Sequence, residues 1–441
     1  MSFPRYPEYK DSGVEWLGEV PAHWEPFPLK RDLAFLTSGS RGWAENYADE
    51  GELFIRIANL TRNGIDLDLH QTQRVSVPEG AEGSRTRVQA GDVLFSITAD
   101  LGSVAVVPDH LGVAYVSQHV ALARLRQSRT VPRWVAYVAL SSIGQRWFEA
   151  QSYGGTKIQL SLDDVRGLPI PVPPQNEQTA IVGFLDRETA KIDALVAEQQ
   201  RLIDLLKEKR QAVISHAVTK GLNSDAPMKP SGVEWLGEVP AHWATTSLRA
   251  LFRQQKRQEQ TGKAVLSVYR EYGVILKDSR DDNINKTPED TSSYQLVNPG
   301  DLVVNKMKAW QGSLGLSSLE GITSPDYAVF VPRHRESPAF LHLLLRSQPM
   351  VSVYRSISNG IRPDQWRLEP DVFLGLPIFL PPEQEQRALV SHLGDISSRC
   401  DALTSEAQQA VDLLLERRTA LISAAVTGQI DVRGAVARSA A

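Results

Sequence analysis

The chain contains a single cysteine, Cys400, among 441 residues, and it has no long hydrophobic run. One thiol can form neither an internal disulfide nor a cysteine-based zinc site. No apolar run approaches the roughly 18 residues that a membrane helix needs, and no basic segment followed by an apolar one opens the sequence. These absences predict a cytoplasmic protein without a membrane span, a signal peptide or a disulfide framework.

The sequence also lacks a strong excess of charge and the common cofactor motifs. The formal charge at pH 7 is -4, so any positive DNA-binding surface must be local or must come partly from a partner. The nine histidines show no HExxH or similar spacing, which gives metal chemistry little support. Neither a GxGxxG motif after a strand nor a GxxxxGKS/T loop is present, so we expect no dinucleotide or P-loop phosphate site.

An internal duplication organises the chain. Residues 12–24 and residues 231–243 both read SGVEWLGEVPAHW, without a substitution. The stretch that follows each copy differs in sequence and length, and in both halves it ends at a Pro-Pro pair that opens a long helical segment. The order of constant flank, variable domain and long helix occurs twice in the chain. This repetition predicts a tandem duplication with pseudo-two-fold symmetry.

The two long segments, residues 173–220 and 381–428, carry apolar residues with helical periodicity opposite a charged face. At a rise of about 1.5 Å per residue, about 43 residues give a helix of about 65 Å, far longer than an ordinary globular helix. We expect the two apolar stripes to bury each other within one chain; two unrelated surface helices are the alternative. The stripes contain Leu185, Ile192, Leu195, Val196, Leu202, Ile203, Leu206, Val213, Ala217, Leu393, Leu403, Val411, Leu414 and Leu421, with imperfect positions at Gln199, Cys400 and Ala407.

Within the repeated segment, tryptophan, leucine and valine predict a short anchor that packs onto a fixed part of the fold. A proline breaks each copy into two turns. A structural role for the tryptophans is the favoured interpretation, and contact with a ligand is the alternative. The anchor residues are Trp16, Leu17, Val20 and Trp24 in the first copy and Trp235, Leu236, Val239 and Trp243 in the second.

Both variable stretches predict a compact α+β domain. Short β-prone runs separated by glycine-containing turns precede a helix and then a basic glycine turn. In the first domain the expected strands are residues 53–57, 93–97, 104–107 and 120–125, the expected helix is residues 132–151, and the turn ends at Lys157. In the second, residues 299–304 correspond to 90–95, residues 324–330 to 117–123 and the helix at 339–354 to 132–151, and the turn ends at Arg362. The two domains therefore share a fold and differ in their surfaces.

Together these features resemble the specificity subunit of type I restriction-modification enzymes. The resemblance rests on the duplicated SGVEWLGEVPAHW, the GDVLFS and GDLVVN strands, the two basic glycine turns, and LPIPVPPQNEQ and LPIFLPPEQEQ ahead of the long helices. It covers nearly the whole chain, and the duplicated order is more specific than any single motif.

The resemblance implies that each variable domain is a target-recognition domain, which reads one half of a split, asymmetric site in double-stranded DNA. It implies that the two long helices pack as an antiparallel coiled coil, hold the domains a fixed distance apart and dock two modification subunits. S-adenosylmethionine is then expected on the modification subunits, and ATP and magnesium on separate restriction subunits, with no cofactor in this chain. The outer helix residues Glu198, Lys207 and Arg210 are either solvated or in contact with such a partner.

The expected fold class is α+β, with two tandem pseudo-symmetric halves. The expected boundaries are residues 1–24 for the N-terminal flank, 25–167 for target-recognition domain 1, 168–222 for the central long helix, 223–243 for the repeated flank, 244–375 for target-recognition domain 2, 376–430 for the distal long helix and 431–441 for a disordered C-terminal tail.

A protein-interaction scaffold and a self-contained modification enzyme are the alternatives. Residues 324–327 read Ser-Pro-Asp-Tyr, which superficially suggests the Asp/Asn-Pro-Pro-Tyr loop of adenine methyltransferases, but the second proline is missing. The counterpart in the first half, residues 117–120, reads Ser-Gln-His-Val. We therefore expect a non-catalytic reader, which DNA binding itself would distinguish from a scaffold.

Base edges are read by Arg, Lys, Asn, Gln, Ser or Thr on exposed loops, and phosphates are held mainly by Lys and Arg. Solvated surface is the alternative for every candidate. The candidates of the first domain are Arg41, Asn59, Thr61, Arg62, Thr98, Gln118, His119 and Lys157. The candidates of the second domain are Tyr269, Arg270, Asn305, Lys306, Lys308, Trp310, Gln311, Asp326, Tyr327 and Arg362. Lys157 and Arg362 occupy corresponding turns, which favours a shared phosphate-clamping role.

Overall fold

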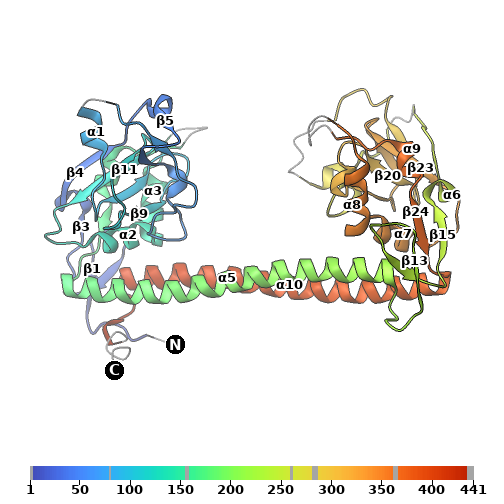
Figure 1. Ribbon diagram of the computed structural model, residues 1–441. Helices are drawn as coiled ribbons and strands as arrows, with labels where there is room; N and C mark the ends of the chain where they lie inside the picture. The colour runs from blue at the N-terminus through green and yellow to red at the C-terminus, as the bar shows by residue number, and fades with distance from the viewer. Residues whose placement is uncertain are drawn as a thin grey trace. The chain divides into compact units, whose positions relative to one another are not determined.

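A computed structural model describes residues 3–78, 81–153, 158–258, 262–280, 287–360 and 366–434. The chain divides into two compact units: unit 1 comprises Met1–Gln199 and Gln409–Ala441, and unit 2 comprises Gln200–Gln408. Both long helices cross this boundary, so each unit contains one half of each helix. Within each unit, strands and short helices precede a long helix, as the α+β prediction requires (Figure 1).

Unit 1 is built around two four-stranded sheets. Before the long helix its strands are β1 (Tyr9–Asp11), β2 (Glu19–Pro21), β3 (Phe27–Pro28), β4 (Leu33–Ser38), β5 (Tyr47–Ala48), β6 (Glu52–Ile55), β7 (Arg74–Val75), β8 (Val93–Ser96), β9 (Val104–Val106), β10 (Ala114–Val116), β11 (Val120–Leu125) and β12 (Pro169–Ile170). Its short helices are η1 (Leu29–Arg31), η2 (Trp43–Asn46), η3 (Ile57–Asn59), α1 (Ala81–Thr86), α2 (Pro132–Leu140), α3 (Ser142–Gln151) and α4 (Leu162–Gly167). The central sheet is antiparallel with the order β4-β11-β8-β9, and the second sheet has the order β10-β6-β7-β5. The predicted strands at β6, β8, β9 and β11 are confirmed.

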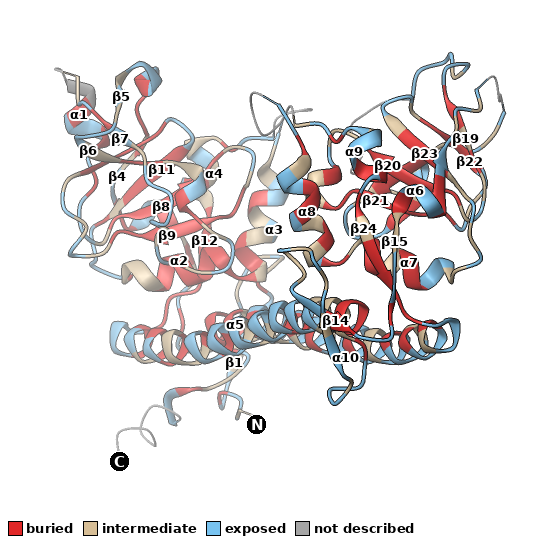
Figure 2. Ribbon diagram, turned by 45° about the vertical axis from the view of Figure 1, so that its right-hand side comes forward, coloured by how far each residue is buried: buried red, intermediate tan, exposed pale blue. Residues whose placement is uncertain are grey.

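Unit 2 repeats the central sheet. Its strands are β13 (Met228–Pro230), β14 (Glu238–Pro240), β15 (Ala244–Ser247), β16 (Phe252–Gln254), β17 (Leu266–Tyr269), β18 (Gly273–Leu276), β19 (Gln295–Val297), β20 (Leu302–Asn305), β21 (Leu314–Leu316), β22 (Gly321–Thr323), β23 (Tyr327–Pro332) and β24 (Pro377–Leu380). Its short helices are α6 (Leu248–Leu251), η4 (Lys277–Ser279), η5 (Ala309–Gln311), α7 (Pro338–Leu345), α8 (Gln348–Ile357) and α9 (Pro370–Leu374). The sheet order β16-β23-β20-β21 matches β4-β11-β8-β9 strand for strand. In both central sheets the inner strands are largely buried, as are β9 and β21, whereas the edge strands β4 and β16 carry exposed residues (Figure 2).

Each variable domain contains two short helices where one longer helix was expected. The helical span predicted at residues 132–151 is confirmed, but it is not continuous, because Ser141 has an extended backbone and separates α2 from α3. The helix predicted at 339–354 is likewise divided, at Ser347 between α7 and α8. Both serines are buried, and each donates its hydroxyl to the carbonyl three residues earlier, at 2.6 Å and 2.7 Å. Such local hydrogen bonds compete with continuation of a helix.

The second short helix of each pair begins against a long helix. The backbone N–H of Ser142 donates to the hydroxyl of Ser423 at 3.0 Å. In unit 2 the backbone N–H of Gln348 donates to the hydroxyl of Ser215 at 3.3 Å. Each long helix therefore supplies a side-chain acceptor to a helix start, which needs one for its free N–H groups.

The two long helices are α5 (Gln175–Lys220) and α10 (Glu383–Val426). In unit 1 the first half of α5 packs on the last half of α10, and Arg418 pairs with Asp193 at 2.8 Å. In unit 2 the second half of α5 packs on the first half of α10, and Arg210 pairs with Asp401 at 2.6 Å. Each helix half therefore runs antiparallel to its neighbour (Figure 1), and the two ion pairs occupy equivalent positions of the repeat.

Eleven of the fourteen residues of the predicted apolar stripe are buried or half-buried, but three of its leucines are exposed. Leu195, Leu202 and Leu403 were assigned to the buried face and are 52 %, 42 % and 47 % exposed. Leu205 and Leu413 are also exposed, by 51 % and 65 %. Because each long helix packs on one other long helix, an apolar face wider than a coiled-coil seam leaves part of its flank uncovered.

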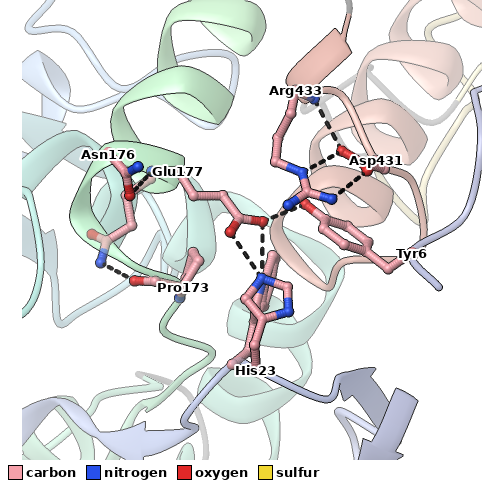
Figure 3. A network of polar contacts seen from close by, with 9 residues as sticks. Tyr6, His23, Pro173, Asn176, Glu177, Asp431 and Arg433 are labelled. Atoms are coloured by element: carbon pink, nitrogen blue, oxygen red, sulfur yellow. Dashed lines mark hydrogen bonds and ion pairs between the residues drawn. The ribbon is translucent and has the colours of Figure 1, made fainter. Parts of the chain in front are cut away.

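The repeated tryptophan anchor attaches to the first turn of a long helix. In unit 1, Glu177 is buried and accepts hydrogen bonds from the Tyr6 hydroxyl at 2.7 Å and from Trp24 Nε1 at 3.2 Å. Its second oxygen lies 2.9 Å from Nε2 of His23 (Figure 3). Burial and this carboxylate raise the pKa of Tyr6, so the hydroxyl remains a donor. The structural interpretation of Trp24, which is fully buried, is confirmed.

Unit 2 repeats this attachment with Glu385. Its carboxylate accepts from Trp243 Nε1 at 3.2 Å and lies 2.7 Å from Nε2 of His242. Trp243 is 1 % exposed, which confirms its structural role. The His-Trp pair of the repeated segment and the glutamate of the helix start are therefore partners in both halves.

The glutamine that follows each glutamate fixes the start of the first helix of the pair, α2 in unit 1 and α7 in unit 2. Gln178 accepts the backbone N–H of Val131, directly before α2, at 3.0 Å. Gln386 accepts the backbone N–H of Ser337, directly before α7, also at 3.0 Å. Both glutamines are fully buried. The Glu-Gln pair thus joins three segments in each unit: the anchor, the long helix and the first short helix.

Segments from the two ends of the chain meet in unit 1. The backbone N–H of Asp431 donates to the carbonyl of Pro4 at 2.7 Å, and Val432 is fully buried. Arg433 pairs with Asp431 at 2.6 Å, and its guanidinium lies 4.8 Å from the ring centre of Tyr6 (Figure 3). The expectation of a disordered tail is wrong for residues 431–434, and the rest of the tail lies outside the described residues.

Candidate nucleic-acid interface

Three candidates of unit 1 meet at one end of the central sheet, where β8 ends and β11 begins. His119 is exposed, and its Nδ1 lies 3.0 Å from Thr98 Oγ1 while its Nε2 lies 3.0 Å from Gln118 Nε2. Because an amide nitrogen can only donate, these contacts fit a neutral imidazole that accepts from Gln118 and donates to Thr98. The Gln118 carbonyl and the Thr98 hydroxyl proton remain for a ligand, and they are groups that read base edges.

Arg62 is held next to this cluster by the β8–β9 connection. Its Nη2 donates to the carbonyl of Leu101 at 2.7 Å, and its Nε pairs with Asp100 at 2.7 Å. Ser103 donates to the other oxygen of Asp100 at 2.6 Å. The Arg62 side chain is 56 % exposed. Since Asp100 compensates its charge and fixes its direction, Arg62 is better suited to a directional acceptor than to general attraction of phosphates.

The sequence interpretation missed exposed residues beside the glycine turn. Gln159 forms bridges with both Thr98 and Tyr153, which brings the residues on both sides of the glycine turn to the same sheet end. Tyr153 is 49 % exposed and Ile158 is 43 % exposed. An aromatic residue directly before a glycine turn was the available signal. Lys157, the predicted phosphate clamp, lies outside the described residues.

The remaining candidates of unit 1 are Asn59, Thr61 and Arg41. Asn59 does not present a reading edge, because it is 1 % exposed and its amide is used within the fold. Its Oδ1 accepts the N–H of Arg56 at 2.9 Å, and its Nδ2 donates to the carbonyl of Asp68 at 2.8 Å. Asn59 was therefore wrongly chosen as a base reader and is a loop-fixing residue. Thr61 is half-buried beside β9, and Arg41 is exposed after β4.

In unit 2, six of the ten candidates line one surface pocket of 300 Å³, which we call the unit 2 pocket. It lies at the same end of the central sheet as the cluster of unit 1, between the ends of β17, β20 and β23. The six are Tyr269, Arg270, Asn305, Lys308, Gln311 and Tyr327, and Ser267, Val268, Glu271 and Ser313 complete the lining.

Strand pairing and a short helix set the geometry of the unit 2 pocket. Asn305 and Tyr327 face each other as the last pair between β20 and β23. The chain then turns back through η5, which ends at Gly312 with a φ of +90°. A residue with a side chain is strained in this conformation, so glycine allows the turn that leaves Gln311 on the pocket wall.

The pocket carries both neutral and charged groups. Burial raises the pKa of Tyr327, and hydrogen bonds with Val268 and Ser267 oppose the shift, so the phenol is neutral near pH 7. Arg270 pairs with Glu271 at 3.0 Å, which compensates its charge. Lys308 is exposed, and among the described residues its ammonium group has no partner. The wall is therefore mainly polar and uncharged, with one available cation.

Lys306, Trp310 and Asp326 do not line this pocket. Lys306 donates to the carbonyl of Pro325 at 3.1 Å, and burial together with the charge of Arg367 lowers its pKa. Asp326 is exposed in the turn before β23. Arg362 lies outside the described residues.

Trp310 has a largely structural environment. Its ring packs edge-on against Trp366 with 5.4 Å between the ring centres, and its Nε1 donates to the carbonyl of Met307 at 3.1 Å. It is half-buried, so only part of its ring can meet a ligand. The sequence interpretation missed Trp366, because no local pattern connects it with a turn more than fifty residues earlier.

Metal and membrane chemistry find no support in the described parts of the chain. Among those residues no group of three or more His, Cys, Asp and Glu side chains could hold a metal ion. No described helix is both long enough and apolar enough to span a bilayer.

Comparisons with known proteins agree with one another. Residues 21–203 match the family model for the type I restriction modification DNA specificity domain. The chain is 22 % identical to the type I restriction enzyme StySPI specificity subunit of Salmonella potsdam and 19 % identical to the EcoKI specificity subunit of Escherichia coli K12, each over 94 % of this chain and 90 % of the relative. A solved chain from a study of complex assembly and conformational transition of the type I R-M system is 17 % identical, with a TM-score of 0.61 over 92 % of this chain and 98 % of that chain. The structural likeness is one of fold.

Proposed function

Because this chain belongs to the family of type I restriction-modification specificity subunits, which recognise DNA targets and are not catalytic, we propose that each unit reads one half of a bipartite, asymmetric site in double-stranded DNA. The target-recognition domains are residues 25–167 and 244–375. The flanks at 1–24 and 223–243 and the helical segments at 168–222 and 376–430 form the constant frame.

The observation that carries this proposal is the equivalence of the two sheet ends. Equivalent strands deliver loops to the same end of the central sheet in both units, yet the side chains differ. Unit 1 presents Thr98, Gln118 and His119, whereas unit 2 presents the pocket with Asn305 and Tyr327. One framework with two different sets of base-reading groups supports two different half-sites, and hence an asymmetric sequence rather than a palindrome.

Two modification subunits would dock on the long helices. Each unit exposes at least one leucine of each long helix, among them Leu195 and Leu413 in unit 1 and Leu205 and Leu403 in unit 2. Leu195 and Leu403 are repeat counterparts, and so are Leu205 and Leu413. The apolar surface of one unit is thus repeated in the other, which supports two copies of one partner. Exposed leucines on adjacent helices are typical of partner-binding surfaces.

The long helices would also set the separation of the two half-sites. A helix of 46 residues spans about 69 Å at a rise of about 1.5 Å per residue. Its length is determined by the number of residues, so deletion or insertion of whole turns would alter the distance between half-sites while leaving each half unchanged. Glu198, Lys207 and the outer face of α5 would contribute to partner docking.

The remaining components would come from partners. S-adenosylmethionine would be bound by the modification subunits, and ATP and magnesium by restriction subunits of the full complex, with no cofactor in this chain. The chain would act in the cytoplasm, where the DNA is. Lys157 and Arg362 would hold phosphates, and the exposed candidates of both units would contact bases or the backbone.

Methylation-dependent sequencing tests the proposal. DNA is compared from cells that express this chain with its modification partner and from cells that express the partner alone. We expect a split, asymmetric adenine-methylated motif only when this chain is present. Replacing Gln118 and His119 by Ala should relax the preference in one half of the motif and leave the other half unchanged. An assembled, active complex that adds no motif would contradict the proposal and favour a scaffold.

A further inference from the structure

We propose that the unit 2 pocket holds one nucleobase, which leaves the base stack when unit 2 binds its half-site. The inference rests on the proposed function and adds a mode of recognition to it. Extrusion of a base from a duplex costs a few kcal/mol, which pocket contacts must offset.

The shape of the site favours an extruded base over readout in the groove. Side chains that read a stacked duplex protrude, because they must reach base edges on the groove floor. Asn305, Gln311 and Tyr269 instead line a recess of 300 Å³. A recess contacts only what enters it, and the parts of DNA that can do so are a phosphate or a base that has left the stack.

Polar groups without partners line this recess. The Tyr269 hydroxyl is buried and, among the described residues, has no hydrogen-bond partner. Asn305 uses its Oδ1 to accept the N–H of Met307 at 3.1 Å, while no described group accepts from its Nδ2. The side-chain amide of Gln311 is likewise unpaired within the described part of unit 2. Of these groups the Tyr269 hydroxyl is a buried polar atom, which is rarely left without a partner. Together with the two amides it matches the donors and acceptors of a base edge.

Charge and aromatic content favour a base over a phosphate. A phosphate site needs several converging cations or N–H donors, but Glu271 already pairs with Arg270 at 3.0 Å. That leaves Lys308 as the available cation among the described lining residues. Tyr269 and Tyr327 both line the pocket, and aromatic rings are surfaces on which bases stack and which phosphates do not use. The Arg280 guanidinium lies over the Tyr269 ring, 5.3 Å from its centre. Lys308 is suited to the phosphate that adjoins the extruded base.

The test uses the full chain with its modification partner and duplexes that carry the site found by methylation mapping. One abasic residue is moved stepwise through both half-sites, and affinity is measured for the wild type and for Tyr269→Phe. We expect one position at which the abasic residue weakens wild-type binding about tenfold, as loss of a stacked base does. At that position Tyr269→Phe should cause no additional loss, whereas on the intact site it should weaken binding several-fold.

Two controls separate recognition from folding. Tyr269→Phe removes a hydroxyl that has no partner in the free protein, so its unfolding temperature should equal that of the wild type or exceed it. Tyr272→Phe makes the same change at a 57 % exposed tyrosine outside the pocket lining and should bind like the wild type. If the loss of binding free energy from an abasic residue added to the loss from Tyr269→Phe at every position, no base would occupy the pocket. The inference would then be overturned. An effect of Lys308→Ala alone would indicate a phosphate and would also overturn it. Absence of sequence-specific binding by the wild type would contradict the proposed function itself.

Discussion

Glu177 of unit 1 and Glu385 of unit 2 occupy the same position of the repeat, yet their surroundings differ. Both contact the tryptophan and histidine of an anchor segment, but Glu177 also accepts from Tyr6. The Glu177 side chain is 6 % exposed and that of Glu385 is 27 % exposed. Tyr6 belongs to the N-terminal segment, and Arg433 of the C-terminal segment lies over its ring. In unit 1, non-covalent contacts thus join the end of α10 to the first anchor segment. In unit 2 the chain itself joins the end of α5 to the second anchor segment, through β13.

The two recognition surfaces differ in a second way. In unit 1 the candidate reading groups form a hydrogen-bonded row on the surface, centred on His119. In unit 2 they surround a pocket, because the chain turns back through η5 after Asn305. The central sheet holds the strand ends in equivalent places, while the connecting loops decide whether the surface is open or recessed. A constant frame can therefore support unlike modes of recognition.

The largest expected effect is the loss of partner binding at one of the two proposed docking surfaces, while the other keeps its partner. Leu195→Glu combined with Leu413→Glu should remove one of two bound modification subunits, because burial of each leucine contributes about 1.5–3 kcal/mol. Affinity at unit 1 should fall by more than about a hundredfold, at about 1.4 kcal/mol per factor of ten. Native mass spectrometry measures the stoichiometry. Leu69→Glu, at a 39 % exposed leucine of unit 1 outside the long helices, should leave it unchanged. Retention of two partners by the double variant would refute this docking surface.

A second prediction compares the two glutamates. Glu177→Ala should lower the free energy of unfolding by about 3 kcal/mol and Glu385→Ala by about 1 kcal/mol, because the first leaves more buried donors without an acceptor. Urea denaturation of the two variants measures the difference. Glu208→Ala, an exposed position of α5, is the control and should behave like the wild type. Equal losses of unfolding free energy in the two variants would mean that the Tyr6 hydrogen bond does not stabilise unit 1.

A third prediction is an acid sensitivity confined to unit 2. Burial, assisted by the charge of Arg346, lowers the pKa of His342 to about 4. Below pH about 6.5, His342 is protonated in the unfolded chain but stays neutral in the folded chain until about pH 4. The free energy of unfolding should therefore fall between pH 6.5 and 4, by up to about 1.4 kcal/mol per pH unit. The equivalent residue of unit 1 is Ala136, which cannot titrate.

His342→Ala should therefore flatten the dependence of stability on pH, although the cavity it leaves costs stability at every pH. Urea denaturation at pH 7 and pH 5 measures both effects. A smaller slope should remain, because burial also lowers the pKa of His334. Parallel losses in the wild type and the variant would exclude His342 as the cause.

The smallest expected effect concerns the two interhelical ion pairs. The Arg418 side chain is 7 % exposed and that of Arg210 is 40 % exposed. Arg418→Met should cost about 1–2 kcal/mol, since the hydrogen bonds of a nearly buried guanidinium to Asp193 are lost, whereas Arg210→Met should cost less than about 0.5 kcal/mol. A double-mutant cycle with each aspartate isolates the pair energies. Equal coupling energies would show that burial does not distinguish the two sites.

Much of the constant frame of anchor segments and long helices was predictable because its motifs are repeated in the sequence. The long helices, the anchor tryptophans and the Glu-Gln pair recur at fixed offsets, and recurrence distinguishes a structural motif from chance. The division of the short helices was not predictable. Apolar periodicity continues through Ser141 and Ser347, and the break depends on contacts with Ser423 and Ser215 from distant helices. The predicted burial of Leu195, Leu202 and Leu403 was wrong for a similar reason, because apolar periodicity does not show how many neighbours cover a helix.

Residue type located part of the candidate site. Choosing polar and aromatic residues near strand ends identified six residues that converge in one pocket, but the convergence depends on three loops whose paths no local pattern determines. Asn59 was wrong because the amide chemistry that suits a base edge also suits a loop clamp. Tyr153 and Trp366 were missed because their exposure and packing arise from tertiary contacts.

The identical copies of SGVEWLGEVPAHW have a consequence for inheritance. Each variable domain begins after one anchor segment and ends before one Glu-Gln pair, and the contacts of these joints, from Trp24 to Glu177 and from Trp243 to Glu385, exclude the recognition loops. A gene fragment exchanged at these joints would bring a whole recognition domain into a frame that already fits it. Recombination could then replace one half-site in a single event, without the gradual loss of function that stepwise mutation of a reading surface entails.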